Sequence, residues 1–250
     1  MKTAVLIHGQ PRFGRCTTEL FAKFIDHDAV DWFLYLWEET SPDPRGWNLV
    51  APCWEKISHE FTVDQFQRRL PAGHRIAKCI VSPLDIVTIP EFHRKPDETS
   101  GVGSYLQFWT MHQCDLLRRE RESISGTYDA VIKLRPDTRL APDLSAERIL
   151  EQITAQPDNT VWTSHLGRFG YSGQINDQFA LGSSKAMSEY CDLAVYIQEY
   201  QDAGVQFHPE TLLAHHVSQR NLVDICSEYT VELRPYVQHR DSGLTEDFGD

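Results

Sequence analysis

Short, continuously apolar runs alternate along this chain with longer segments of helical periodicity. Three such runs lie at residues 3–8, 31–37 and 128–134, and the second reads DWFLYLW. A strand with one face in solvent alternates polar and apolar residues, whereas a strand covered on both faces is apolar throughout, as in parallel sheets. Helices between such strands supply the crossovers that parallel pairing needs. The alternation predicts an α/β fold with a mostly parallel central sheet and helices on both faces.

The intervening segments carry apolar residues three and four positions apart, which is the period of an amphipathic helix. Helices are expected over residues 17–28, 63–70, 104–122 and 184–203, and from Pro209 onward. Ser104 suits the N-cap of one of these helices and Gly204 the C-terminal end of another. Further strands are expected over residues 75–81, 160–165, 178–181, 222–225 and 230–233. The Pro- and Gly-rich stretches 40–52 and 83–103 are expected to be loops.

The length and charge of the chain limit its domain organisation and its partners. The 250 residues are expected to form one domain over residues 1–237, followed by a polar, mobile tail over residues 238–250. The formal net charge is −12, which disfavours nucleic acid and anionic membranes, because binding to either relies on Lys and Arg. The basic cluster Arg118, Arg119 and Arg121 alternates with glutamates and is expected to be a solvated helix face.

The cysteines and the apolar segments bear on the compartment. The six cysteines are spread out without a CxxC pair, so neither structural zinc nor a disulfide framework is expected. Cys79, Cys191 and Cys226 lie in apolar stretches and are expected to be small buried hydrophobes. No apolar segment reaches the roughly 18–20 residues of a membrane helix, and the run at residues 4–7 is shorter than a signal-peptide core. These features predict a cytoplasmic protein without a membrane span.

Ligands of such sheets bind beyond the carboxyl ends of the strands. At one of these ends, Arg135-Pro136-Asp137 follows the apolar run 128–134. The Asp137 carboxylate can hold Mg²⁺ or Mn²⁺, which are hard ions that prefer oxygen ligands, and the ion can in turn hold a diphosphate. Arg135 can pair with that carboxylate or contact phosphate directly. Pro-Asp-Thr is also good turn chemistry, and that alternative stays open.

Two further segments carry carboxylates next to predicted elements. Asp177 follows Asn176 and precedes an apolar stretch, where it can act as a general base for a hydroxyl or join a metal shell. An Asx turn before a strand is the alternative interpretation. Glu210 lies in the first turn of the helix that Pro209 opens, where the helix dipole favours a carboxylate in any case. His216 lies near the apolar face of that helix and is expected to be a hydrogen-bonded core histidine.

The turn after the first strand reads His8-Gly9-Gln10-Pro11-Arg12. Gly9 allows the backbone to approach a ligand closely, and Arg12 can face a phosphate. The turn matches neither the GxGxxG dinucleotide fingerprint nor the GxxxxGK[ST] loop, and the chain contains no GxSxG elbow. These absences disfavour a dehydrogenase, a P-loop enzyme and an α/β-hydrolase.

Taken together, the motifs resemble those of nucleotide-diphosphosugar glycosyltransferases of the GT-A fold, especially microbial and viral members related to lipopolysaccharide- and capsule-type transferases of polysaccharide biosynthesis. The resemblance runs over residues 3–235 as ordered islands, which read AVLIHGQPR, SYLQFW, YDAVIKLRPDT, NDQFALGSS and HPETLL. It implies a Rossmann-like GT-A architecture. It also implies transfer of a sugar from a nucleotide-diphosphate sugar to a hydroxyl acceptor, with a glycan as the expected acceptor.

In GT-A enzymes an acidic motif, often Asp-x-Asp, ends a central strand and holds Mn²⁺ or Mg²⁺ against the donor diphosphate. The corresponding stretch here is Arg135-Pro136-Asp137, in which only the last position is acidic. The resemblance therefore implies that Asp137 binds the metal ion, with Arg135 supplying part of the positive charge.

The resemblance also assigns the remaining candidate residues. Gly9, Gln10 and Arg12 are implied to border the nucleotide. Asp177 is implied to face the acceptor as the general base, and Glu210 is a second candidate for that role.

Two alternatives stay open from the sequence. The missing first carboxylate is consistent with a catalytically inactive GT-A-like module that binds a nucleotide or a glycan. A metal-dependent phosphohydrolase acting on the same kind of ligand is the other. Trp109, Phe169 and Tyr171 can offer faces to a sugar or a base, although the helical spacing of Trp109 favours a place in the core.

Overall fold

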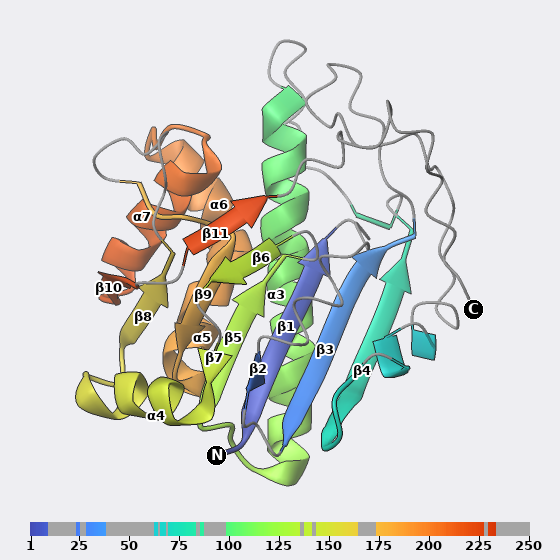
Figure 1. Ribbon diagram of the computed structural model, residues 1–250. Helices are drawn as coiled ribbons and strands as arrows, with labels where there is room; N and C mark the ends of the chain where they lie inside the picture. The colour runs from blue at the N-terminus through green and yellow to red at the C-terminus, as the bar shows by residue number, and fades with distance from the viewer. Residues whose placement is uncertain are drawn as a thin grey trace, which may run out of the picture.

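A computed structural model of the protein describes residues 1–9, 24–25, 29–38, 63–64, 66–68, 70–83, 86–87, 99–135, 138–141, 144–164, 174–227 and 230–233. In these residues a central sheet of seven strands dominates the molecule (Figure 1). Its strands, in chain order, are β1 (Thr3–Gly9), β3 (Val30–Trp37), β4 (His74–Ser82), β5 (Ala130–Leu134), β8 (Thr160–Thr163), β9 (Phe179–Gly182) and β10 (Val223–Cys226). The helices are α3 (Thr99–Ser125), α4 (Ala146–Ala155), α5 (Ser184–Cys191), α6 (Leu193–Asp202) and α7 (Pro209–Gln219).

The order of the strands across the sheet is β10-β8-β9-β5-β1-β3-β4. β1 pairs in parallel with β3 on one side and with β5 on the other. The chain thus runs outward from β1 to β3 and β4, and then returns to the opposite side of β1. Among the described strands of this sheet, β9 alone runs antiparallel to its neighbours β5 and β8. The predicted Rossmann-like α/β fold with a mostly parallel sheet is confirmed.

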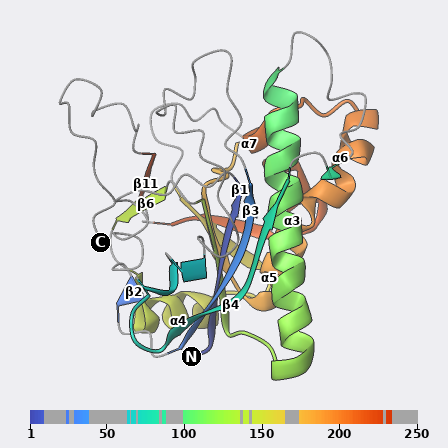
Figure 2. The same cartoon turned by 90° about the vertical axis from the view of Figure 1, so that its right-hand side faces the viewer.

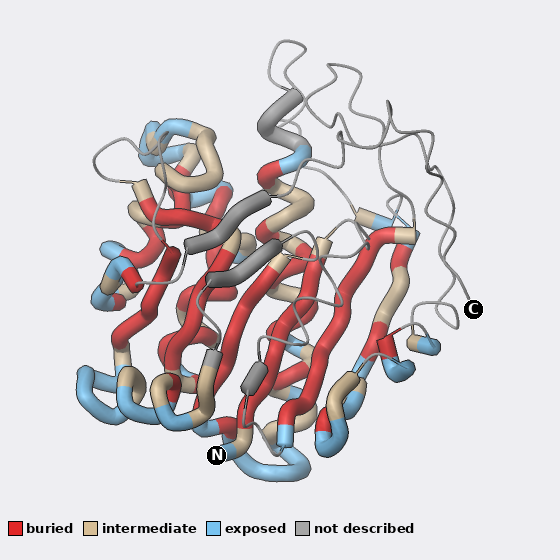
Figure 3. Tube along the Cα trace, in the orientation of Figure 1, coloured by how far each residue is buried: buried red, intermediate tan, exposed pale blue. Residues whose placement is uncertain are grey.

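Helices cover both faces of the sheet. Figure 2 shows α3, α5 and α6 on one side and α4 on the other. Two small two-stranded sheets lie on the α4 side. In one, β2 (Phe24–Ile25) pairs with β7 (Leu144–Ser145), and in the other, β6 (Thr138–Ala141) pairs with β11 (Thr230–Leu233). Figure 3 shows that the central strands are buried along most of their length.

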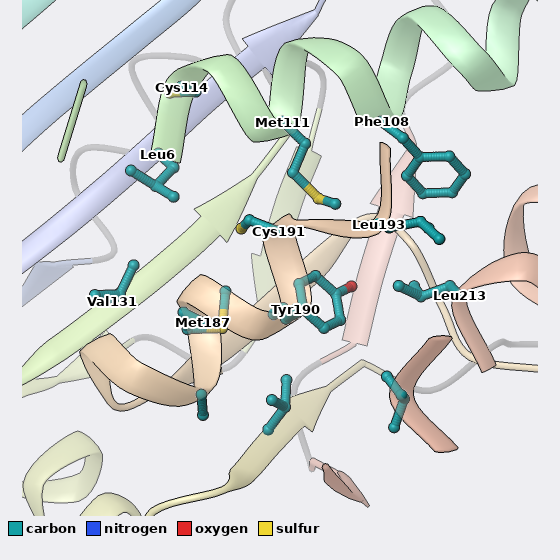
Figure 4. Close-up of a cluster of buried hydrophobic side chains, with 14 of the residues drawn as sticks. Leu6, Phe108, Met111, Cys114, Val131, Met187, Tyr190, Cys191, Leu193 and Leu213 are labelled. Carbon is teal, nitrogen blue, oxygen red and sulfur yellow. The ribbon is translucent and has the colours of Figure 1, made fainter. Parts of the chain in front are cut away.

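The residues of β1 show why the strand is apolar throughout. Ala4 and Leu6 belong to the core beneath α3, whereas Val5 and Ile7 belong to the core on the α4 side. All four are buried. Successive side chains of a strand point to opposite faces, so a strand between two helical layers must be apolar at every position. Figure 4 shows the core on the α3 side, where Leu6 lies near residues of α3 and α5.

A network of buried charges joins α3 to α5 and α6. The Arg118 guanidinium is fully buried and donates to Asp115 Oδ1 at 2.7 Å, Glu122 Oε2 at 2.6 Å and Ser184 Oγ at 2.6 Å. Arg119 donates to the other Asp115 oxygen at 2.6 Å. The prediction that this basic cluster is a solvated helix face is therefore wrong for Arg118. The carboxylate partners lie on α3 itself, whereas the contact between Arg118 and Ser184 joins segments that only the fold brings together.

The second half of the chain departs from the predicted elements in one helix. The helix expected over residues 184–203 is two helices, α5 and α6, which meet at Asp192. The Asp192 carboxylate accepts a hydrogen bond from Arg119 at 2.7 Å and lies 3.0 Å from His112 Nδ1. These contacts with α3 hold Asp192 outside helical geometry. Gly204 follows α6 at φ +78°, which agrees with its predicted place at the helix end.

Three other local predictions are corrected. α3 begins at Thr99, so residues 99–103 are helical rather than part of a loop and Ser104 is not its N-cap. Phe24 and Ile25 form β2 instead of a helix, because they pair with β7. Cys226 is exposed, whereas Cys79 and Cys191 are buried as predicted.

His216 is the core histidine that the pattern indicates. It is fully buried, with Nδ1 lying 2.9 Å from Tyr200 Oη and Nε2 lying 2.7 Å from the Glu189 carbonyl oxygen. Burial lowers its pKa to about 4, so the imidazole is neutral at physiological pH. This histidine contributes to packing and hydrogen bonding between α6 and α7.

The segment 40–52 and the tail 238–250 lie outside the described residues. Within the ranges that the structure describes, no helix is long and apolar enough to cross a membrane.

Arg118→Met is expected to lower the free energy of unfolding by about 3–5 kcal/mol, because it removes a fully buried cation from between the carboxylates of Asp115 and Glu122 and leaves Asp115 with Arg119 alone. Arg68→Met is the matched control. Its side chain is 71% exposed and pairs with Asp64 within one helical turn, so it is expected to cost only about 0–1 kcal/mol. Urea denaturation of both variants measures the difference. Equal stabilities for the two variants would contradict a structural role for the buried network.

Candidate functional site

The carboxyl ends of β1 and β5 lie side by side at the point where the strand order reverses. Ile7 of β1 pairs with Leu134 of β5, so Gly9 and Arg135 follow at the same edge of the sheet. Gly9 has φ +101°, a left-handed conformation that glycine adopts without strain. In open α/β sheets the crevice at such a reversal is the usual ligand site.

Part of the predicted donor site falls outside the described residues. Gln10, Arg12 and Asp137 are in this group, as are Phe169 and Tyr171. Their predicted roles toward a nucleotide, a metal ion and a sugar stay predictions.

The structure brings Asp177 and Glu210 together from two separate segments. Asp177 precedes β9 and is 5% exposed. Glu210 lies in the first turn of α7, with its side chain 25% exposed. Burial raises the pKa of the Glu210 carboxyl, and the negative charge of Asp177 raises it further, while His208 and Arg135 oppose the rise. Asp177 and Arg135 are therefore each within electrostatic reach of Glu210.

Asp177 is held by two other elements, and its neighbours form a turn around it. The side-chain amide of Gln107 on α3 donates to Asp177 Oδ2, and the Lys133 ammonium on β5 donates to the main-chain oxygen of Asp177. Asn176 Oδ1 accepts from the Gln178 N–H at 2.8 Å, which is the Asx turn expected as the alternative interpretation. The turn is made by Asn176, so the Asp177 carboxylate remains available to the site.

The sequence analysis did not identify Gln107 and Lys133. A signal existed for Lys133, because it is the one charged residue inside an otherwise apolar strand, AVIKL. No local pattern points Gln107 at a residue 70 positions away.

Polar side chains lie near the buried Oε2 atom of Glu210. His208 Nδ1 lies 3.0 Å from Glu210 Oε2, and the His208 side chain is 46% exposed. Gln174 Nε2 lies 3.4 Å from Thr211 Oγ1 and 3.5 Å from His208 Nδ1. The site therefore combines an amide, an imidazole, a hydroxyl and carboxylates, and offers both hydrogen-bond donors and acceptors.

Helix α3 connects the two sides of the site. His8, near the end of β1, is 1% exposed, and its Nδ1 lies 3.2 Å from Thr110 Oγ1. Thr110 and Gln107 are three residues apart, so they share one face of the helix. One turn of α3 thus contacts both the carboxyl end of β1 and the carboxylate of Asp177.

Trp109 lies beside this turn but packs as a core residue. Its ring stacks on Trp37 with centroids 5.6 Å apart and an interplanar angle of 13°, and Trp37 is 2% exposed. Tyr35 meets the same ring edge-on at 5.5 Å. This packing agrees with the expected place of Trp109 in the core.

The described residues do not by themselves form a metal centre. Asp177 and Glu210 are oxygen ligands of the kind that Mg²⁺ and Mn²⁺ take. Among the described residues, however, no group of three or more His, Cys, Asp or Glu side chains gathers closely enough to hold an ion. The Mn²⁺ or Mg²⁺ prediction depends on Asp137 and stays a prediction.

A hollow in the surface lies at the opposite end of the sheet from the candidate site. Its lining includes Asn159, which precedes β8, and Leu222, which precedes β10. Lys185 in this hollow lies 3.5 Å from Asp158, and Arg220 forms an ion pair with Glu189. Both cations are thus already paired with carboxylates, and the strand ends there are amino ends. The hollow is a weaker candidate than the switch point.

No protein-family model matches the chain, and a comparison with curated proteins finds no match.

Glu210→Gln is expected to gain stability relative to the wild type as the pH rises from about 4 to about 7. The folded-state pKa of Glu210 is raised, so the contribution of this residue to stability is greatest below its unfolded-state pKa and falls as the pH rises through the folded-state value. Gln does not titrate, so the variant escapes this loss. Urea denaturation across the pH range measures the effect.

Asp31→Asn is the matched control with the opposite sign. Burial acts against ionisation of Asp31, but hydrogen bonds from Arg75 and Tyr128 outweigh it and lower the pKa. The stability that Asp31→Asn loses relative to the wild type should therefore grow as the pH rises. A stability difference for Glu210→Gln that does not change with pH would contradict the paired-carboxylate geometry.

Proposed function

We propose that the protein transfers a sugar from a nucleotide-diphosphate sugar to a hydroxyl group of an acceptor. The observation that carries this proposal is the carboxylate pair Asp177–Glu210 beside Arg135, at the switch point of a doubly wound sheet. β5, which Arg135 follows, is the middle strand of the seven. This position fits the GT-A resemblance, in which the donor-binding motif ends a central strand.

The acceptor side of the reaction needs a base. As the hydroxyl oxygen attacks the anomeric carbon of the donor, its proton must leave. In the proposed mechanism the Asp177 carboxylate takes that proton. Gln107 donates to one Asp177 oxygen and thereby fixes the orientation of the carboxylate. Glu210 lies beside Asp177 and is the second candidate for the base.

The donor side needs positive charge, because the bond from the anomeric carbon to the diphosphate breaks and leaves a nucleoside diphosphate. Arg135 follows β5 at this edge and supplies a guanidinium that can bind phosphate with two parallel hydrogen bonds. Gly9, Gln10, Arg12 and Asp137 complete the proposed donor site. A divalent ion, where bound, would stabilise the leaving diphosphate. The proposed proton transfer to Asp177 does not depend on it.

The expected acceptor is a glycan. Gln174, His208 and Thr211 place an amide, an imidazole and a hydroxyl next to Glu210. Such a mixture of donors and acceptors suits a ligand with several hydroxyl groups better than an apolar or a strongly charged one.

An inactive GT-A-like binding module is the second candidate. Arg135 in place of a first carboxylate favours it. The orientation of Asp177 by Gln107 favours an enzyme, because binding alone does not need an oriented carboxylate within electrostatic reach of a second one. A phosphohydrolase would use the same carboxylates to activate water and would cleave the diphosphate itself.

Asp177→Asn is expected to lower the transfer rate by about 10²–10⁴-fold, which is the usual contribution of a positioned general base. The amide keeps the shape of the side chain, so nucleotide affinity should not change. Asp158→Asn is the control. Asp158 is 62% exposed at the opposite end of the sheet, and its loss should leave the rate unaltered. A wild-type rate in Asp177→Asn would show that Asp177 is not the base.

A thermal-shift screen of nucleoside diphosphates and their sugars, with and without Mn²⁺ or Mg²⁺, tests the donor site. A ligand that binds only the folded state adds about 2.7 kcal/mol of stability at a hundredfold excess over Kd. We expect a shift for one nucleotide family, and this shift should be lost in Arg135→Met. A shift that also requires the metal and Asp137 would support the predicted ion. No shift with any donor would contradict the proposed function.

A further inference from the structure

Lys133 is a buried cation in the centre of the sheet. It is 1% exposed, and its register neighbours are Leu6 on β1 and Ala180 on β9, which are both fully buried. Removing an ammonium group from water is costly unless the protein supplies strong hydrogen bonds in return. An apolar side chain would suit a strand that is buried at every position, so the presence of a lysine calls for an explanation.

Lys133 has a contact in the candidate site, unlike Arg118, a second buried cation of the described residues. Arg118 lies against the carboxylates of Asp115 and Glu122 on its own helix and joins α3 to α5 through Ser184. The Lys133 ammonium donates to the main-chain oxygen of Asp177. Asp177 lies in the short segment between Gln174 and β9 that carries the proposed base.

Two hydrogen bonds reach this segment from different elements, and a third lies within it. Lys133 holds the main chain of Asp177 from β5, and Gln107 holds its carboxylate from α3. Asn176 Oδ1 accepts from the next amide, Gln178 N–H, at 2.8 Å. Once the carbonyl and the following amide of Asp177 are both fixed, the direction in which its side chain leaves the backbone is fixed as well.

We propose that Lys133 is a positioning residue, which fixes the Asp177 carboxylate beside Glu210. The purpose assigned to that carboxylate rests on the proposed function, whereas the positioning itself does not. The inference predicts that loss of Lys133 has a local effect on the Asp177 segment rather than a general effect on the fold.

Hydrogen exchange measured by NMR at single amides tests this inference without any knowledge of the substrate. In Lys133→Met, the Gln178 amide is expected to exchange at least about tenfold faster, because a hydrogen bond from a charged donor to this segment is lost. Lys133→Gln keeps a donor without the charge and should restore part of the protection. Amides of β1 and β3 should exchange at wild-type rates in both variants.

Arg118→Met is the control for a purely structural buried cation, and it should raise exchange across the sheet and α3 together. Unchanged exchange at Gln178 in Lys133→Met would overturn the inference, as would a uniform rise across the sheet.

A kinetic readout separates the inference from the proposed function. If transfer activity is found, Lys133→Met should lower kcat while leaving the KM for the donor unchanged, and Lys133→Gln should recover part of kcat. A fall in donor affinity with kcat unaltered would contradict the positioning role. If no donor supports transfer, the proposed function fails, and the exchange result alone still decides whether Lys133 positions Asp177.

Discussion

The rest of the structure depends on the parallel pairing of β1 with a neighbour on each side. Hydrogen bonds to β3 and β5 satisfy its backbone on both edges, and its side chains enter the two cores alternately. A strand in this position can be neither polar nor short, which is why its sequence is continuously apolar. Because the chain departs from β1 in one direction and returns on the other side, the carboxyl end of β1 also defines the place where a ligand can enter.

The position of the candidate site follows from this pairing through α3. The long helix lies across β1 and β3, and His8 and Thr110 connect it to the end of β1. Its far half is joined to α5 and α6 by the Arg118 and Arg119 network. A helix attached at Thr110 and again at Arg118 and Arg119 can hold Gln107, one turn before Thr110, steadily against Asp177. The stability of the buried network and the geometry of the site are thus properties of the same helix.

The sequence reveals those features of the molecule that depend on local pattern. The central strands are visible because burial on two faces leaves an unbroken apolar run. Asp177 and Glu210 are visible because each is a carboxylate at the boundary of a predicted element. The reversal of β9 and the break at Asp192 are not visible, because they depend on partners distant in the chain. Gln107 and Lys133 act on Asp177 across 70 and 44 residues, and no local spacing encodes those contacts.

Identifying which bond of the donor the protein breaks is the most direct test of the proposed glycosyl transfer. The protein would be incubated with an equimolar mixture of common nucleotide-diphosphate sugars and a panel of oligosaccharides, and the nucleotides would be followed by chromatography and mass spectrometry. Glycosyl transfer predicts that one donor is consumed and released as its nucleoside diphosphate, while one oligosaccharide gains the mass of a sugar residue. Release of a nucleoside monophosphate and a sugar phosphate would show cleavage within the diphosphate, as in a phosphohydrolase, and would contradict the account. So would a mixture in which every donor stays intact.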